Sequence, residues 1–280
     1  MTPVRWAGVL AASVLLSWAA SKLLPGPLLR SGLGRTNYQG RLVPTACGLG
    51  VVAGAALPAG LASACWMRYP FHGALSLAVV AAFAALGLAD DLWGDRTVGG
   101  LKGHLGLLLR GRVTTGALKA LGGAGVAIAA GFLAPNRGPV DAVQTAILVA
   151  LCANAINLLD TRPVRAAAAY VVGALLAAPW AVGRDTEAVF PMALAAATMA
   201  YVPAERRRAA MLGDVGSNAL GAALGLMLAS CAGPAVRIAC IAALVWLHIY
   251  TERHSLSALI DRNWLLHRVD AALRGSNGDS

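Results

Sequence analysis

Long apolar stretches separated by short polar segments run through almost the whole sequence. A helix needs roughly 20 predominantly apolar residues to cross the hydrocarbon core of a bilayer. The pattern predicts about nine such helices, at residues 4–24, 45–64, 73–89, 115–134, 140–159, 164–182, 186–203, 215–232 and 234–251. Several are rich in alanine and glycine, and small residues let membrane helices approach one another closely. We therefore expect an all-α, polytopic membrane domain over residues 1–251.

The two ends of the chain have patterns of their own. The apolar run after Arg5 is too long for a signal peptide, and no small-residue cleavage site precedes a soluble domain, so we interpret it as the first span. Residues 252–280 instead carry apolar residues at spacings that make a rough stripe: Leu256, Leu259, Ile260, Leu266, Val269 and Leu273. This pattern predicts an amphipathic surface helix that ends near Gly275.

The composition agrees with a membrane protein. Hydrophobic residues make up 58% of the chain and charged residues 13%, and the mean hydropathy is +0.66. Soluble domains carry about a quarter charged residues, so a water-soluble globule is excluded, as are disordered, collagen-like and disulfide-rich classes. The 5 cysteines lie in or beside apolar spans without a paired Cys-x-x-Cys spacing. This arrangement predicts buried, inert thiols rather than a metal or redox site.

The formal net charge of +10 is distributed unevenly. With nine spans, all but five of the 23 Lys and Arg residues fall on one side of the membrane; the five are Arg5, Arg68, Arg137, Arg184 and Arg237. All but three of the 13 acidic residues fall on that same side; the three are Asp141, Asp185 and Glu187. Cationic residues in short loops mark the cytoplasmic side. We therefore expect the N-terminus outside and the C-terminus in the cytoplasm.

Aspartates gather at the cytoplasmic ends of the predicted spans. Asp90 and Asp91 end one span, Asp160 follows another, and Asp214 opens a third. Acidic groups at membrane depth are costly and are functional candidates by default. Two adjacent carboxylates repel unless a cation offsets them, and Mg²⁺ prefers one or two carboxylates together with substrate phosphates. The alternative for Asp90 and Asp91 is a helix end solvated by water.

Other polar residues accompany these aspartates. Asn154, Asn157 and Asp160 recur every three residues, which places them on one helix face and predicts a site lining. Hydrogen bonding between helices is the alternative for the two asparagines. The segment Gly213-Asp214-Val215-Gly216-Ser217 predicts a tight turn into a helix N-terminus, which favours anionic groups.

Two cytoplasmic loops are basic and rich in glycine. Residues 96–123 include Lys102, His104, Arg110, Arg112 and Lys119, and exposed amides with cationic side chains are what phosphate groups need. For His104 a structural role is the alternative. Residues 30–48 contain Arg30, Arg35 and Arg41, which fit either a topology signal or an anion-binding loop. Carboxylates, cations and a lipid boundary on one face together favour phosphoryl transfer from a soluble donor to a lipid acceptor.

Three segments carry a resemblance to a known family. LADDLWGD (88–95), NAINLLD (154–160) and MLGDVGSNALG (211–221) resemble successive signature segments of the polyprenyl-phosphate N-acetylhexosamine-1-phosphate transferases, glycosyltransferase family 4. That superfamily includes the phospho-MurNAc-pentapeptide translocase and the initiators of teichoic acid and O-antigen synthesis. NYQGRLVPTACG (37–48) is similar to its first cytoplasmic loop. Order, spacing and sidedness agree over residues 30–250.

The resemblance implies a multi-pass protein of the bacterial cytoplasmic membrane that builds cell-envelope glycans such as peptidoglycan. It implies a Mg²⁺-dependent phosphoglycosyl transferase, with Mn²⁺ as a substitute, that moves a sugar-1-phosphate from a UDP-sugar to undecaprenyl phosphate and releases UMP. Its implied catalytic residues are Asp90, Asp91 and Asp214, with Asp214 and Asp91 on the metal. It implies that Asn157 and Asp160 lie around the nucleotide and that Lys102 and Lys119 contact phosphates. The predicted substrate contacts also include Asn154, His104 and Arg41, from the polar and basic patterns above, and Arg162, which could serve an extra phosphate or acidic group. Nucleic acid is not an expected partner, and the small-residue helices fit either a homodimer or packing within one chain.

The chain departs from the family pattern at three places. Thr161, Arg162 and Pro163 follow Asp160 where the family usually continues with glycine and a second aspartate. TERHSLS (251–257) holds only His254 where the pentapeptide translocase carries a histidine cluster, and a tenth span is absent. These departures leave open another donor sugar or nucleotide, and a catalytically inactive member that acts as a scaffold or regulator. A lipid transporter is a further alternative, which the position of the charges at helix ends disfavours.

Overall fold

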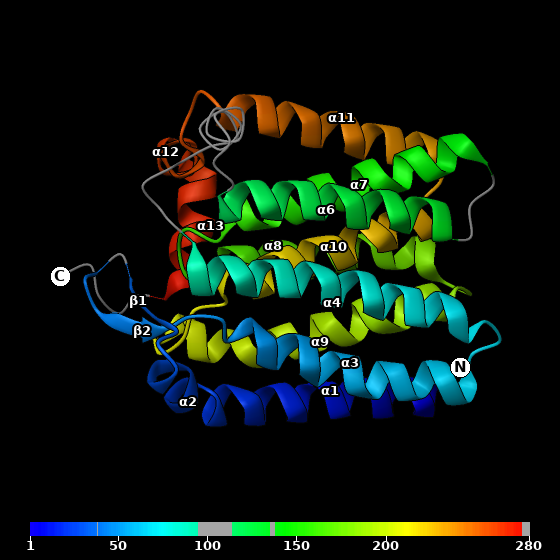
Figure 1. The fold of residues 1–280 in the computed structure, drawn as a ribbon, viewed down its shortest axis with the longest axis horizontal. Coiled ribbons are helices and arrows are strands. Elements are labelled where there is room, and N and C mark those ends of the chain that lie inside the picture. The colour runs from blue at the N-terminus through cyan, green and yellow to red at the C-terminus, as the bar shows by residue number, and fades with distance from the viewer. Residues whose placement is uncertain (38, 95–113, 135–137, 276–280) are drawn as a thin grey trace.

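The computed structural model describes residues 1–37, 39–94, 114–134 and 138–275, and within them the chain is a bundle of long helices that run side by side (Figure 1). Each predicted span coincides with a helix. The helices are α1 (Pro3–Leu23), α3 (Gly48–Trp66), α4 (Pro70–Trp93), α6 (Thr115–Leu133), α7 (Pro139–Leu159), α8 (Arg165–Ala177), α9 (Asp185–Arg206), α10 (Gly213–Cys231) and α11 (Pro234–Thr251). A 3₁₀ turn, η1 (Ala178–Ala181), continues α8.

Length and composition qualify 7 of these helices to cross a membrane: α1, α3, α4, α6, α7, α9 and α11. Helix α8 is shorter, and α10 carries Asp214, Ser217 and Asn218 in its first two turns. The chain is therefore a multi-pass membrane protein with seven candidate spans in its described part, while nine spans and the direction of the termini stay predictions. Large apolar side chains are exposed on the outer helices, as contact with lipid requires.

Helix α10 lies at the centre of the bundle and is buried along most of its length, against α7 on one side and α4 on the other. Glycines make this close packing possible. A Cβ on Gly221 would lie 2.3 Å from the carbonyl oxygen of Cys152, and one on Gly225 would lie 2.6 Å from Cα of Val149. The prediction that small residues bring the spans close together is confirmed for α10 and α7. Because these glycines pack inside one chain, the homodimer stays a prediction.

Five short elements of the described chain lie at one end of the bundle, opposite the N-terminus (Figure 1). They are α2 (Pro25–Arg30), the strands β1 (Gly34–Thr36) and β2 (Leu42–Pro44), and the helices α12 (Leu256–Arg262) and α13 (Trp264–Arg274). The strands form an antiparallel hairpin in which Arg35 pairs with Val43. This end, which we call the basic end, contains the segments to which the charge pattern assigned most Lys and Arg residues. Its position in the cytoplasm stays a prediction.

The C-terminal tail differs from the single amphipathic helix that the sequence predicted. Asn263 separates α12 from α13, and its side chain caps α13 by accepting from the backbone N–H groups of Leu265 and Leu266. Helix α13 ends at Arg274, before Gly275, as predicted. Its polar side is the buried one, because Asp270 is 4% exposed whereas Val269 is 49% exposed. Of the apolar stripe, Leu266 and Val269 are exposed, whereas Leu256, Leu259, Ile260 and Leu273 are half-buried.

The cysteines are free thiols. Cys47, Cys152 and Cys231 are buried as predicted, and burial raises the pKa of the Cys47 thiol to about 12, which keeps it protonated and inert. The prediction is wrong for Cys65, which lies at the end of α3 with its side chain exposed.

Candidate active site

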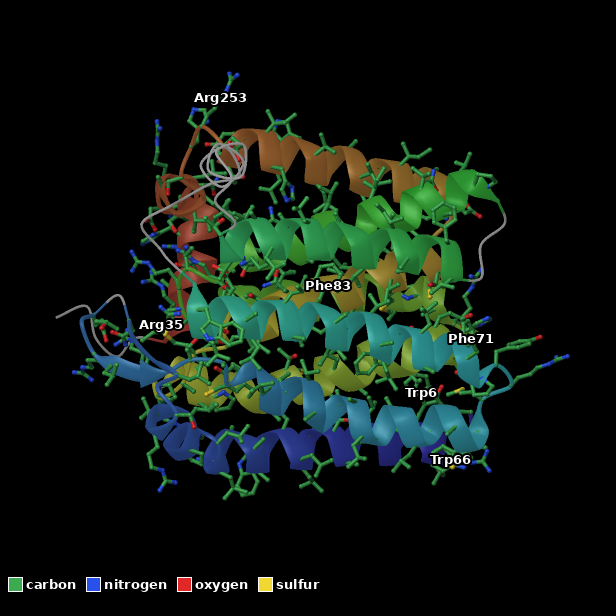
Figure 2. All side chains as sticks on the ribbon, viewed as in Figure 1. Trp6, Arg35, Trp66, Phe71, Phe83 and Arg253 are labelled. Atoms are coloured by element: carbon green, nitrogen blue, oxygen red, sulfur yellow. The ribbon has the colours of Figure 1, made fainter. Side chains whose placement is uncertain are left out.

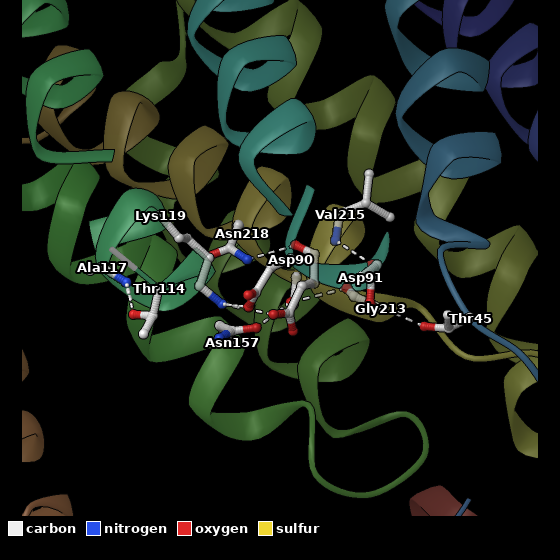
Figure 3. Close-up of polar contacts among 12 residues, drawn as sticks. Thr45, Asp90, Asp91, Thr114, Ala117, Lys119, Asn157, Gly213, Val215 and Asn218 are labelled. Carbon is white, nitrogen blue, oxygen red and sulfur yellow. Dashed lines mark hydrogen bonds and ion pairs between the residues drawn. The ribbon is translucent and has the colours of Figure 1, made fainter. Parts of the chain in front are cut away.

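Asp90 and Asp91 occupy the last turn of α4, and the two carboxylates point in different directions because neighbouring helix positions are separated by about 100°. Asp91 is buried and faces the start of α10. Its Oδ2 accepts from the backbone N–H of Val215 at 3.1 Å, and its Oδ1 accepts from the hydroxyl of Thr45 at 3.3 Å (Figure 3). Asp91 therefore caps the N-terminus of α10 and joins it to the segment that leads into α3.

The start of α10 is held against α4 by two glycines. Gly213 has φ +75°, a conformation that favours glycine, and a Cβ there would lie 2.6 Å from Asp91 Oδ2. A Cβ on Gly87 would lie 2.2 Å from the carbonyl oxygen of Asp214. This close approach brings the side chain of Asp214 to the end of α4. The Asn218 amide donates to the Asp214 carbonyl at 2.6 Å and fixes this turn.

Lys119 joins two of the aspartates. Helix α6 begins at Thr114, whose hydroxyl caps the helix by accepting from the N–H of Ala117 at 3.1 Å. In the next turn the Lys119 ammonium donates to Asp90 Oδ2 at 2.8 Å and to Asp214 Oδ2 at 2.7 Å (Figure 3). The three side chains are 17–30% exposed, so they are partly screened but still reachable from solvent. One ammonium faces two carboxylates, which leaves a net negative charge.

Asn157 belongs to the same cluster. Its Oδ1 accepts from the Ser217 hydroxyl at 2.7 Å, which joins α7 to the first turn of α10. Asn154, one turn earlier, is exposed. The predicted face does not continue to Asp160, because α7 ends at Leu159 and Asp160 has ψ 41°, outside the helix. We call Asp90, Asp91, Lys119, Asn157 and Asp214 the aspartate cluster.

A pocket opens at the basic end of the bundle, between the β1–β2 hairpin, the α7–α8 loop and the α9–α10 loop. We call it the loop pocket. It is lined by Asn37, Val43, Asp160, Thr161, Arg162, Pro163, Glu205, Arg208, Ala210 and Met211. Two non-glycine residues here have positive φ: Arg208 (57°), which lines the pocket, and Val164 (70°), which follows the lining residue Pro163. Such backbone conformations are costly and tend to occur at functional sites.

Of the remaining predicted site residues, Arg41 lies in the described part of the chain away from the aspartate cluster, and two others lie outside that part. Arg41 is exposed in the hairpin, where its N–H donates to Asn37 Oδ1 at 3.0 Å, and it does not join the aspartate cluster. Lys102 and His104 lie outside the described residues. The sequence did not single out Thr45 and Ser217 individually, although both lie in the quoted segments 37–48 and 211–221. It also did not separate Arg35 from its neighbours, yet Arg35 Nη2 donates to the Asp91 carbonyl at 2.5 Å.

The cluster offers two carboxylates to a cation. Within the described part of the chain, no group of three or more His, Cys, Asp or Glu side chains forms a closed metal site. Mg²⁺ differs from zinc in needing only one or two carboxylates, with waters and phosphates completing its shell. Asp90 and Asp214 already bond to one cationic group, Lys119, whereas both oxygens of Asp91 accept from Val215 and Thr45. The residues present thus fit a hard divalent cation.

The close contact at Gly87 leads to a prediction. Gly87→Ala is expected to push α4 and α10 apart and to destabilise the protein by about 1–3 kcal/mol, the usual cost of overpacking. The measurement is the melting temperature in detergent. Gly125→Ala on α6 is the matched control, because its Cβ meets no atom within 4 Å. Equal melting temperatures for the two variants would contradict the close contact.

The fold and the cluster together define a multi-pass membrane protein with a charge-paired aspartate site at one end of its helix bundle. Residues 74–232, more than half of the chain, match the family model described as glycosyl transferase family 4. The chain belongs to this family, which comprises the polyprenyl-phosphate hexosamine-1-phosphate transferases. The match includes Asp90, Asp91, Lys119, Asn157 and Asp214. No curated protein matches the chain.

Proposed function

We propose that the protein transfers a sugar-1-phosphate from a nucleotide sugar, most simply a UDP-sugar, to polyprenyl phosphate at the cytoplasmic face of a bacterial inner membrane. The product is a lipid-diphosphate sugar for cell-envelope glycan synthesis. The observation that carries the proposal is the Lys119 ammonium shared by Asp90 and Asp214 at the basic end of a family 4 bundle. Family membership supports a transferase acting on lipid-linked substrates.

In the proposed reaction an oxygen of the lipid phosphate forms a bond to the sugar-bearing phosphorus of the donor. The bond from that phosphorus to the bridging oxygen breaks, and UMP leaves with that oxygen. Little covalent chemistry is left to the protein, because phosphoryl transfer depends on positioning and on stabilising the charge of the transferred group. Mg²⁺, held by Asp90 and Asp214, would supply charge neutralisation for the phosphate oxygens.

The chain's own residues have distinct tasks in this proposal. Lys119 offers a cation to phosphate oxygens, and it keeps Asp90 and Asp214 close together before substrate arrives. Asp91 holds the N-terminus of α10 in place, with Thr45 and Arg35 bonded to it. We therefore assign Asp91 to support of the site rather than to the metal.

The loop pocket is the proposed place of the donor's nucleotide. Arg162 and Arg208 bring positive charge to it, and Asp160 and Glu205 bring carboxylates that accept N–H groups of a base. Thr161, Arg162 and Pro163 stand here in place of the family's usual glycine and second aspartate. This departure favours a modified donor preference. It is also the observation behind the second candidate function, an inactive family member that acts as a scaffold.

The test is reconstitution of the purified full chain with undecaprenyl phosphate, Mg²⁺ and a panel of radiolabelled nucleotide sugars. We expect labelled lipid and release of the nucleoside monophosphate with one donor, loss of both products with a metal chelator, and recovery with Mg²⁺ or Mn²⁺. Absence of product with every donor would contradict the transferase and favour the scaffold.

A further inference from the structure

The C-terminal tail is bonded to the α7–α8 loop, which forms one wall of the loop pocket. Arg165, at the start of α8, donates from Nε to Asp270 Oδ1 at 2.5 Å and from Nη2 to Asp270 Oδ2 at 2.9 Å. Both residues are buried, with 6% and 4% exposure. The remaining guanidinium nitrogen, Nη1, donates to the Ser257 hydroxyl of α12 at 2.8 Å. Arg165 therefore fastens both tail helices to the loop.

The tail also contacts the pocket lining and the α9–α10 loop. The hydroxyls of Ser257 and Thr161, a lining residue, lie 3.3 Å apart. On the other wall, Arg206 Nη2 donates to the Ala272 carbonyl at 2.7 Å. A Cβ on Gly275 would lie 2.9 Å from Arg206 Nε, so the end of α13 packs on this arginine. The two tail helices thus contact the α7–α8 loop and the end of α9, from which the α9–α10 loop starts.

The loop needs such support because its backbone is strained. Val164 lies between the lining residue Pro163 and Arg165, is 2% exposed and has φ 70°. A β-branched residue in this region is a genuine outlier and persists only where the surrounding structure holds it in place. The bidentate pair at the next residue provides that restraint.

The surroundings of Asp270 favour its ionised form, which the ion pair with Arg165 requires. Burial raises the pKa of Asp270, but hydrogen bonds from Arg165 and the charges of Arg165, Arg274 and Arg162 outweigh it, and the net pKa is lowered. Arg274 Nε also lies 2.9 Å from Asp270 Oδ2. Asp270 is therefore ionised at neutral pH, which favours the pair with Arg165.

We infer that the C-terminal tail is a clamp on the loop pocket, and that Asp270 is a positioning residue for the nucleotide-sugar donor, acting through Arg165. The inference rests on the proposed function. Removing the charge of Asp270 frees Arg165 and the α7–α8 loop, so the pocket loses its shape. The aspartate cluster lies on α4, α6, α7 and α10, whereas Asp270 and Arg165 lie on α13 and α8. Donor binding should therefore weaken while the chemical step is kept.

The experiment compares Asp270→Asn with the wild-type full chain in the reconstituted assay. We expect the donor KM to rise about tenfold or more, since a small misplacement of a positioning group is costly, while kcat and the KM for the lipid phosphate stay within about twofold. Asp270→Glu should recover part of the donor KM. Asp261→Asn is the matched control, because Asp261 lies on the same tail with a side chain 50% exposed. It should behave as wild type.

Two results would overturn the inference: an unchanged donor KM in Asp270→Asn, or a fall in kcat with both KM values unchanged. If Asp270→Asn does not fold, Ser257→Ala removes only the hydroxyl shared with Arg165 and Thr161, and the donor KM should still rise, by a smaller factor. An unchanged KM there also overturns the clamp.

Amide hydrogen exchange separates this inference from the proposed function. Exchange over residues 160–165 should become faster in Asp270→Asn and stay unchanged in Asp261→Asn, whether or not any donor is turned over. Wild-type protein that is inactive with every donor contradicts the proposed function, whereas equal exchange in both variants contradicts the clamp.

Discussion

Replacing Asp214 by asparagine is expected to lower turnover by about 10²–10³-fold or more, the range for loss of one preorganised electrostatic group. Asparagine has nearly the same shape but is neutral, so it cannot balance the charge of Lys119 and offers a hard cation a weaker ligand than a carboxylate. The fold should survive, because the turn is fixed through the Asp214 backbone, whose carbonyl accepts from Asn218. The loss should therefore appear in kcat and in the metal dependence, not in the melting temperature.

The contrast is Asp91→Asn, made in the same way. Asp91 bonds to Val215 and Thr45 rather than to Lys119, and asparagine keeps one oxygen that can accept from the Val215 N–H, so this variant should lose less than the about 0.5–2 kcal/mol that removal of a cap costs. The measurements are initial rates over a Mg²⁺ titration and melting temperatures for both variants. Retained turnover in Asp214→Asn would contradict the assignment of Asp214 as a metal ligand. A shifted Mg²⁺ requirement in Asp91→Asn would mean that Asp91 is a metal ligand after all.

The helix positions could be predicted from the sequence to within a few residues. A backbone inside a bilayer must satisfy its hydrogen bonds within its own segment, so an apolar run of about 20 residues forms a helix. The prediction is weaker at α8 and α10. Helix α8 is short, and α10 begins with Asp214, Ser217 and Asn218, because the start of this helix forms part of the site.

The sequence could place the aspartates at one end of the bundle but could not distinguish their contacts. Asp90 and Asp91 are adjacent and chemically identical, and only the packing of α6 and α10 against α4 decides which one meets Lys119. The same limit holds for Arg35 and Arg41. The hairpin directs Arg35 to a partner 56 residues away, and it leaves Arg41 exposed. Such pairings depend on tertiary packing, which no local pattern contains.

The tail shows that periodicity predicts a helix without predicting which of its faces the protein buries. Its apolar spacing is real, but the buried face of α13 is the one with Asp270, since that carboxylate pairs with Arg165, 105 residues away. A bidentate, buried ion pair is strongly costly to break, which outweighs the gain from turning Leu266 and Val269 inward. Periodicity predicted that a helix forms and where it ends, and long-range charge pairing decided which side it presents.

Replacing Lys119 by glutamine should produce the second large effect. The variant leaves Asp90 and Asp214 facing each other without their shared ammonium, and like charges that share a site repel. We expect turnover to fall on the order of 10²-fold, because a cation that stabilises phosphate charge is lost. The metal-free protein should also be less stable, by less than the about 3–5 kcal/mol that breaking a fully buried pair costs, since these side chains are partly exposed.

Mg²⁺ separates the two contributions of Lys119. A ligand that binds only the folded state stabilises it, so Mg²⁺ should raise the melting temperature of Lys119→Gln more than that of the wild type, where the ammonium competes for the same carboxylates. Lys22→Gln is the control, because Lys22 is exposed at the same end of the bundle. An equal gain from Mg²⁺ in all three proteins would mean that the cation does not bind between Asp90 and Asp214. A larger rise in melting temperature in Lys119→Gln alone would mean that Mg²⁺ and the lysine compete for the carboxylates of Asp90 and Asp214. If turnover is still low in that variant at saturating Mg²⁺, the lysine also binds the substrate phosphates.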